Sequence, residues 1–104
     1  MAQTDYAVSV DIAAKGKMLK HVRFLTRVNI SAAGRLRNAY YDALKSLESN
    51  PQRCPLYKPN NSIGEELRYL LFSERYRVVF GIVGKAVFVY DIQDARQNVD
   101  KNLV

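Results

Sequence analysis

Three arginines recur in the last third of the sequence and could together bind an anion. Arg68, Arg77 and Arg96 lie among aromatic and β-branched residues, in short hydrophobic stretches between positions 66 and 98. A guanidinium group presents a planar fork of N–H donors that matches the oxygens of a phosphate or a carboxylate. The pattern therefore predicts an anion site. The alternative is a structural role in ion pairs with nearby carboxylates, namely Glu65, Glu66, Asp91 and Asp94.

Other side chains with catalytic chemistry are sparse. His21 is the only histidine, and we expect it to be a solvated residue on a helix. Cys54 is the only cysteine, so it cannot form an internal disulfide, and we interpret it as an incidental thiol. The sequence has no cluster with metal-ligand spacing and no glycine-rich phosphate loop, so we expect neither a metal nor a cofactor.

Composition limits the class of protein. A chain of 104 residues with 48% hydrophobic content predicts a single globular domain over residues 1–104. The net charge of +6 favours a polyanion or an acidic protein as partner. No stretch is as long and apolar as a membrane span, and no signal segment is recognisable, so we expect a cytoplasmic protein without membrane contact.

The first half of the chain predicts one strand and two helices. Residues 6–12 alternate apolar and polar side chains, which is typical of a strand with one buried face. Helical spacing follows over residues 14–28, and a second helix is predicted over 32–48 with Ser31 as its N-cap. The second helix should bury Leu36, Tyr40, Ala43, Leu44 and Leu47. The first helix carries a basic stripe with Lys20, Arg23 and Arg27, beside Lys15 and Lys17.

The second half predicts three strands after a proline-rich loop over residues 50–64. The strands are expected at 67–72, 76–83 and 86–93, with turns at 73–75 and at Gly84-Lys85, the latter of type II′. The order strand, helix, helix, strand, strand, strand predicts an α+β fold, with a helical hairpin packed on a small antiparallel sheet.

Alternation in the middle strand predicts which face carries Arg77. Tyr76, Val78, Phe80 and Ile82 should meet the helices. Arg77 should stand on the opposite face, where Gly81 would leave a shallow depression for a ligand. A glycine in a strand is equally compatible with a bulge or with close packing.

The residues around these arginines resemble a known family. The ordered runs ELRYL (66–70), RYRVVF (75–80), VFVYDI (87–92) and ARQ (95–97), with the opening strand and the helical hairpin, are similar to the RelE/ParE superfamily of bacterial toxins, also called plasmid stabilisation proteins. The resemblance covers nearly the whole chain. It implies the toxin of a type II toxin–antitoxin system, neutralised by an acidic antitoxin encoded beside it.

The resemblance also assigns roles to residues. The antitoxin would wrap an extended or helical segment along the helices and the sheet, and Lys20, Arg23 and Arg27 are candidates for contacts with it. RelE-like members cut messenger RNA on the ribosome, whereas ParE-like members poison DNA gyrase. Arg77 matches the tyrosine-arginine position that RelE-like members use on phosphate, and Arg96 and Arg68 lie near two further basic positions.

Proton transfer is less well matched to the RelE-like pattern. RNA cleavage needs a base for the 2′-hydroxyl and an acid for the leaving oxygen. Leu70 stands where a second basic residue is expected, and residues 97–104 contain no tyrosine or histidine. Tyr90 or Asp94 would have to substitute.

The ending from Asp94 to Gln97 resembles ParE-like members. We therefore expect a ParE-like toxin acting on gyrase or on translation. One alternative is a metal-independent, ribosome-dependent mRNA endoribonuclease, and another is a non-toxic module that binds nucleic acid or only an antitoxin.

Overall fold

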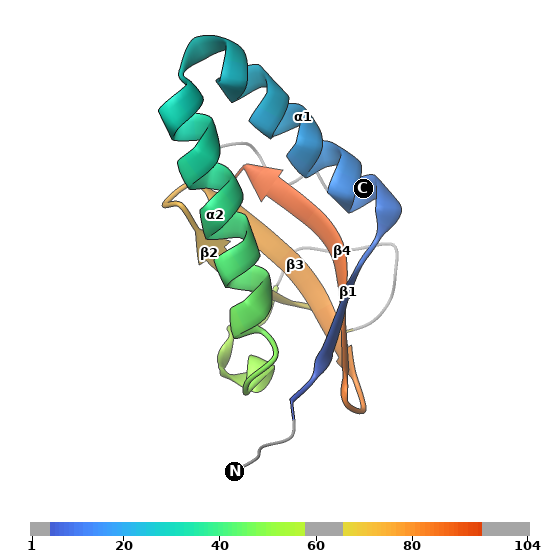
Figure 1. Ribbon diagram of the computed structural model, residues 1–104. Coiled ribbons are helices and arrows are strands. Elements are labelled where there is room, and N and C mark those ends of the chain that lie inside the picture. Colours follow the sequence, from blue (N-terminus) through green and yellow to red (C-terminus); the bar gives the residue numbers. More distant parts are fainter. Residues whose placement is uncertain (1–4, 58–65, 95–104) are drawn as a thin grey trace.

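A helical hairpin covers one face of a four-stranded sheet in the computed structural model, which describes residues 5–57 and 66–94 (Figure 1). This α+β arrangement confirms the predicted fold class. In chain order the elements are β1 (Ala7–Val10), α1 (Ile12–Val28), α2 (Ile30–Ser46), the short 3₁₀ helix η1 (Pro51–Arg53), β2 (Arg68–Phe72), β3 (Tyr76–Val83) and β4 (Ala86–Asp94).

The sheet is mixed. Its strand order is β1-β4-β3-β2, so the first strand of the chain pairs with the last one. The meander of β2, β3 and β4 is antiparallel as predicted, whereas β1 runs parallel to β4, from Ala7 opposite Ala86 to Val10 opposite Val89. The helical hairpin provides the long crossover that a parallel pair requires.

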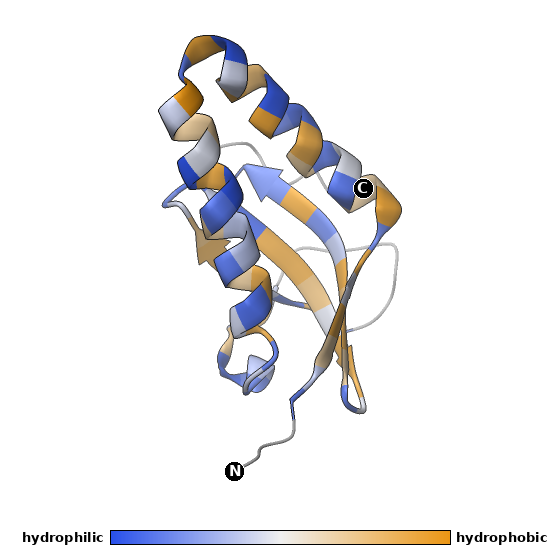
Figure 2. Cartoon of the chain, in the orientation of Figure 1, coloured by the Kyte–Doolittle hydropathy of each residue, from blue (hydrophilic) through white to orange (hydrophobic). Residues whose placement is uncertain are grey.

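The main core lies between the sheet and the hairpin. The bulky side chains of β3 predicted to meet the helices do so: Tyr76, Val78 and Phe80 are buried in this core, and Ile82 packs against it. Hydrophobic colours dominate β3 beneath the helices in Figure 2. The predicted stripe of α2 is confirmed as well, with Leu36, Tyr40, Ala43 and Leu47 buried and Leu44 packed at the edge.

A second, smaller cluster lies on the other face of the sheet. Tyr57, Leu67 and Val79 are buried there, with Tyr69 and Tyr90 packed against them. Gly81 is itself buried, which is not what an open depression at this position would require.

The strand predicted over residues 6–12 is too long. β1 ends at Val10 because the carboxylate of Asp11 accepts a hydrogen bond from the Ala13 backbone N–H and so caps α1. Ile12, assigned by alternation to a buried strand face, lies in the first turn of the helix and is 83% exposed.

The cap of α2 also differs from the prediction. The side chain of Asn29, rather than Ser31, accepts from the Ala32 backbone N–H. The same Asn29 closes α1, since its backbone N–H donates to the Leu25 carbonyl. One extended residue therefore joins the two helices, which makes the hairpin turn sharp.

Both sheet turns lie where they were predicted. Gly84 has a φ of +58°, while Lys85 is not among the residues with positive φ, as a type II′ turn requires. At the other turn Ser73 and Glu74 both adopt positive φ.

Candidate functional site

Arg77 lies on the sheet face that points away from the helices, as predicted. It stands opposite Leu71 and Gln93 in the register, and its guanidinium carbon lies 5.7 Å from the centre of the Tyr69 ring. Its Nε is buried and makes no hydrogen bond within the described part of the chain. Arg77 Nε is therefore an unsatisfied buried donor in the described part of the chain.

Gln93 belongs to a buried polar network beside Arg77. Its Nε2 donates to the Tyr57 hydroxyl at 2.9 Å and to Asp91 Oδ2 at 3.1 Å. Asp91 Oδ1 in turn lies 2.6 Å from Lys17 Nζ, which comes from α1. Gln93 is fully buried, and its Oε1 has no hydrogen-bond partner among the described residues.

A β-bulge gives this network its position. The pairing of β3 with β4 passes from Asp91 opposite Val79 to Val89 opposite Phe80, so Tyr90 is the extra residue. Since β1 ends beside Val89, residues 90–94 of β4 have no neighbouring strand on that side among the described residues, and Lys17 of α1 contacts Asp91 there. Lys17 can therefore reach around this edge from the helix layer.

Arg68 and Arg77 do not form one site. Arg68 stands opposite Phe80, whose side chain enters the main core, whereas Arg77 is an odd number of positions from Phe80 and points the other way. The predicted anion site of three arginines is therefore not assembled within residues 5–57 and 66–94.

Arg68 is engaged in holding the chain. Its Nη1 donates to the backbone carbonyls of Cys54, at 2.7 Å, and Gln52, at 3.2 Å, and its Nη2 lies 3.9 Å from Glu66. These bonds fasten the segment after α2 to β2, where Leu56 forms an isolated bridge with Arg68. This geometry resembles the structural alternative more than an open phosphate site.

The remaining predicted site residues are dispersed. Arg96 lies outside the described residues. Asp94 stands opposite Tyr76 on the helix side of the sheet, where its Oδ2 lies 3.0 Å from Arg75 Nη2. Tyr90 is half-buried in the smaller cluster, with its ring edge-on to Phe88. Asp94 and Arg77 therefore point to opposite faces.

His21 is not the solvated residue that its position suggested. Its half-buried ring lies edge-on to Tyr76, with 5.1 Å between the ring centres. Burial lowers the pKa of His21 below its usual value of 6.5, while the nearby Asp94 carboxylate acts in the opposite direction. His21 therefore lies on the helix side of the sheet, away from the Arg77 face.

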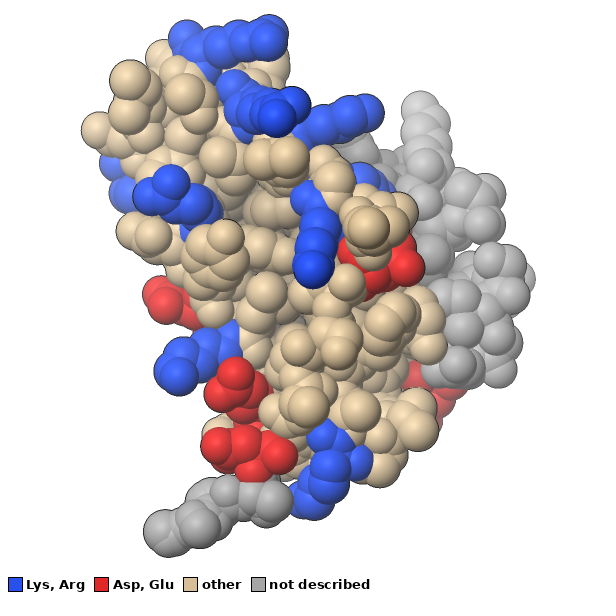
Figure 3. Space-filling view, turned by 45° about the vertical axis from the view of Figure 1, so that its right-hand side comes forward, with Lys and Arg blue, Asp and Glu red and all other residues tan. Residues whose placement is uncertain are grey.

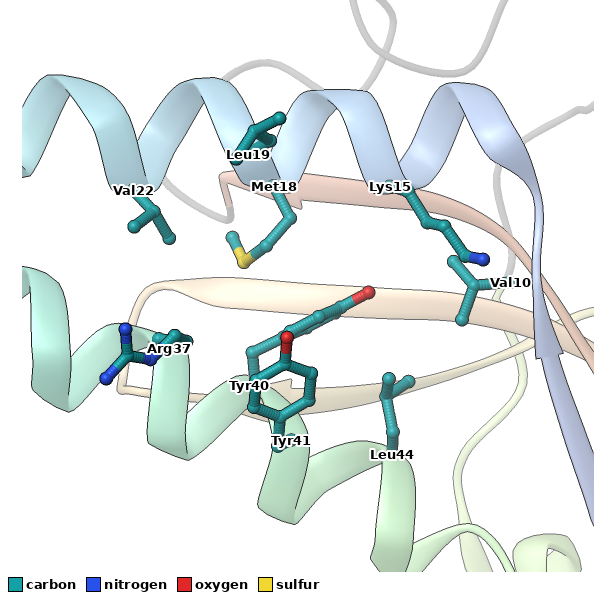
Figure 4. Close-up of a pocket in the computed structure, with 9 residues that line it drawn as sticks. All are labelled: Val10, Lys15, Met18, Leu19, Val22, Arg37, Tyr40, Tyr41 and Leu44. Carbon is teal, nitrogen blue, oxygen red and sulfur yellow. The ribbon is translucent and has the colours of Figure 1, made fainter.

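An apolar groove separates α1 from α2. It encloses about 470 Å³, and Figure 4 shows Met18 and Val22 pointing into it from α1. Lys15 lies at one end and Arg37 at the other. Burial raises the pKa of Tyr40, so its phenol in the groove is neutral at physiological pH. The lining residues are Val10, Lys15, Met18, Leu19, Val22, Arg37, Tyr40, Tyr41 and Leu44.

The hairpin that forms this groove carries all of the chain's excess positive charge. Residues 12–41 contain seven lysines or arginines and no acidic residue, which leaves nine basic and ten acidic residues elsewhere. Figure 3 shows lysine and arginine side chains gathered over the upper end of the molecule, where the hairpin tip lies. Lys17 alone among the seven forms an ion pair within the described residues.

Large apolar side chains are exposed on the same hairpin. They are Ile12, Leu19, Phe24, Val28, Ile30 and Tyr41. Lys20, Arg23 and Arg27, the predicted antitoxin contacts, are exposed on α1, but Lys15 and Arg37 flank the groove itself. The absence of acidic residues over 30 positions is a signal that sequence reasoning could have used and missed.

Cys54 is buried, and burial raises the pKa of its thiol, so it is a poor nucleophile.

The described residues contain no cluster of potential metal ligands. None of the helices in the described part is long and apolar enough to cross a membrane.

Neither protein-family models nor curated proteins match this chain in sequence.

Proposed function

We propose that this chain is the toxin of a RelE/ParE-like toxin–antitoxin pair, held inactive by an acidic protein that binds its helical hairpin. The segregated charge of the hairpin carries the proposal. The hairpin carries six exposed cations without ion pairs in the described region, two of them, Lys15 and Arg37, at the apolar groove, and an acidic amphipathic segment would complement both features.

The working surface in this proposal is the opposite face of the sheet, around Arg77. The guanidinium group beside Tyr69 suits a phosphate or carboxylate of the target. The described residues around Arg77 provide no evident acid or base for proton transfer. The only histidine lies on the helix side, and the Asp91 carboxylate is already bound by Lys17 and Gln93. This favours a ParE-like toxin that binds gyrase or another target over a nuclease.

Controlled expression in bacteria tests toxicity. We expect growth arrest without the acidic partner, relief in Arg77→Ala, and continued arrest in Lys85→Ala, a matched control at the exposed turn of the same sheet. Full toxicity of a stably folded Arg77→Ala variant would rule out the assigned working surface.

Two parallel assays distinguish the possible targets. Inhibition of DNA supercoiling by purified gyrase, without RNA cleavage, is the expected result. Ribosome-dependent cleavage of messenger RNA would instead select the endoribonuclease. Absence of growth arrest and of both activities would leave a non-toxic binding module.

The partner surface has its own test. A small acidic protein encoded beside this chain should bind it, and Lys15→Glu with Arg37→Glu should weaken binding at least tenfold. Lys45→Glu with Lys85→Glu makes the same change in net charge at two exposed positions that do not line the groove, and it should have a much smaller effect. Equal losses in both variants would indicate attraction by net charge alone.

A further inference from the structure

The geometry points to Lys17 as a positioning residue for the Arg77 face, and we propose this role although Lys17 belongs to the helix layer. The contribution of Lys17 to toxicity rests on the proposed function. The connection itself is a chain of contacts from Lys17 through Asp91 to Gln93, which stands opposite Arg77.

The first contact crosses between the layers. Lys17 Nζ lies 2.6 Å from Asp91 Oδ1, and the Asp91 side chain is only 8% exposed. A nearly buried carboxylate requires compensation by a cation or by hydrogen bonds. Asp91 Oδ1 also accepts from the Ile92 backbone N–H at 2.9 Å. Lys17 therefore supplies the positive charge that compensates this carboxylate beside the sheet edge.

The second contact fixes the Gln93 amide. Asp91 Oδ2 accepts a hydrogen bond from Gln93 Nε2, and the same nitrogen donates to the Tyr57 hydroxyl at 2.9 Å. Two acceptors on one side determine which end of the amide faces them. Gln93 Oε1 is consequently turned away from both.

The outcome is a pair of unused polar atoms on facing strands. Gln93 Oε1 is an acceptor and Arg77 Nε is a donor; both are buried, and neither makes a hydrogen bond among the described residues. Loss of the Lys17 charge would leave the buried Asp91 carboxylate without its cation and favour its rearrangement, which would release the Gln93 amide to rotate towards Arg77. Lys17 thus keeps the Arg77 side chain available.

Nuclear magnetic resonance of the ¹⁵N-labelled full chain tests this directly. Arg77→Lys removes and so assigns the Arg77 Nε–Hε signal, and Gln93→Glu assigns the Gln93 side-chain NH₂ pair. In Lys17→Met both sets should shift, whereas Lys17→Arg should keep them near their wild-type positions. Lys20→Met removes an exposed lysine of the same helix and should leave both unchanged.

The double variant Lys17→Met, Asp91→Leu keeps the test valid if Lys17→Met fails to fold, since no unpaired carboxylate remains. Its decisive readout is the Arg77 Nε–Hε signal, which should shift, because Asp91→Leu itself removes one hydrogen-bond partner of Gln93. Gln93 and Arg77 signals at wild-type positions in a folded Lys17→Met or double variant would overturn the proposal. An equal shift in Lys20→Met would also do so.

Growth assays connect this role to the proposed function. Lys17→Met should weaken growth arrest and Lys17→Arg should preserve it. If the wild-type chain does not arrest growth, the proposed function fails, while the resonance shifts still decide whether Lys17 positions Gln93 and Arg77.

Discussion

Arg68→Ala should mainly reduce stability, whereas Arg77→Ala should mainly reduce the proposed toxic activity. Arg68 donates two hydrogen bonds to backbone carbonyls, and its side chain is 23% exposed. Hydrogen bonds from charged groups contribute about 1.5–3 kcal/mol each, and partial replacement by water reduces the sum, so Arg68→Ala should lower the free energy of unfolding by about 2–3 kcal/mol. For a domain of this size that corresponds to a fall in Tm of roughly 10–20 °C.

Arg77→Ala should lower the free energy of unfolding much less than Arg68→Ala does. Within the described residues its guanidinium group makes one contact with an aromatic ring, and its buried Nε makes no hydrogen bond. Loss of such a cation–π contact costs about 0.5–1 kcal/mol. Arg77→Ala should therefore remain folded and lose the proposed toxic activity, whereas any loss of that activity in Arg68→Ala should follow its loss of stability.

Urea unfolding followed by circular dichroism measures both values on the same scale. Arg68→Lys is the control, because lysine keeps the charge but cannot reproduce the forked donors. It should give an intermediate value. Arg68→Ala within about 0.5 kcal/mol of the wild type, the range of ordinary surface substitutions, would refute the structural role of Arg68. A larger loss of unfolding free energy in Arg77→Ala than in Arg68→Ala would refute the claim that Arg68 contributes more to stability.

Three further predictions concern single positions. Because burial lowers the pKa of His21, the unfolded chain binds a proton before the folded chain does, so stability should fall as pH drops from about 6.5; His21→Asn should flatten this part of a plot of unfolding free energy against pH. Cys54, buried and with a raised thiol pKa, should react with a thiol reagent only on the timescale of unfolding, and rapid labelling of the native protein would contradict this. Gly84→Ala should lower the free energy of unfolding by about 1 kcal/mol, because an L-residue is strained at positive φ. Val83→Ala, a control at an exposed neighbouring position, should show a smaller loss in the same urea titration.

The sequence was most informative where side-chain periodicity is regular. The alternation in β3 predicted correctly that Phe80 enters the main core and that Arg77 faces away from it. The ends of elements were less predictable. Asp11 and Asn29 compete with neighbouring residues for the helix N-termini, and backbone geometry rather than residue type decides which side chain reaches the N–H groups.

The site was predictable only in part because strand register was unknown. Arg68 and Arg77 are nine positions apart in sequence, but their faces depend on how β2 aligns with β3, and a shift of one residue reverses the side-chain direction. The bulge at Tyr90 and the approach of Lys17 around the end of β1 likewise arise from tertiary packing. No local pattern marks Gln93 as the residue opposite Arg77.

The pairing of the first strand with the last one affects how this protein is made. During synthesis β1 and both helices emerge before β4, so residues 7–10 remain without their hydrogen-bonded neighbour until residues 86–89 have been translated. Closing a contact so distant in sequence is slow compared with forming the local β3–β4 hairpin. The newly made chain must therefore pass through a stage in which the amphipathic helices exist without a completed sheet. A partner that binds the hairpin could engage the nascent chain at that stage, before the Arg77 face has formed.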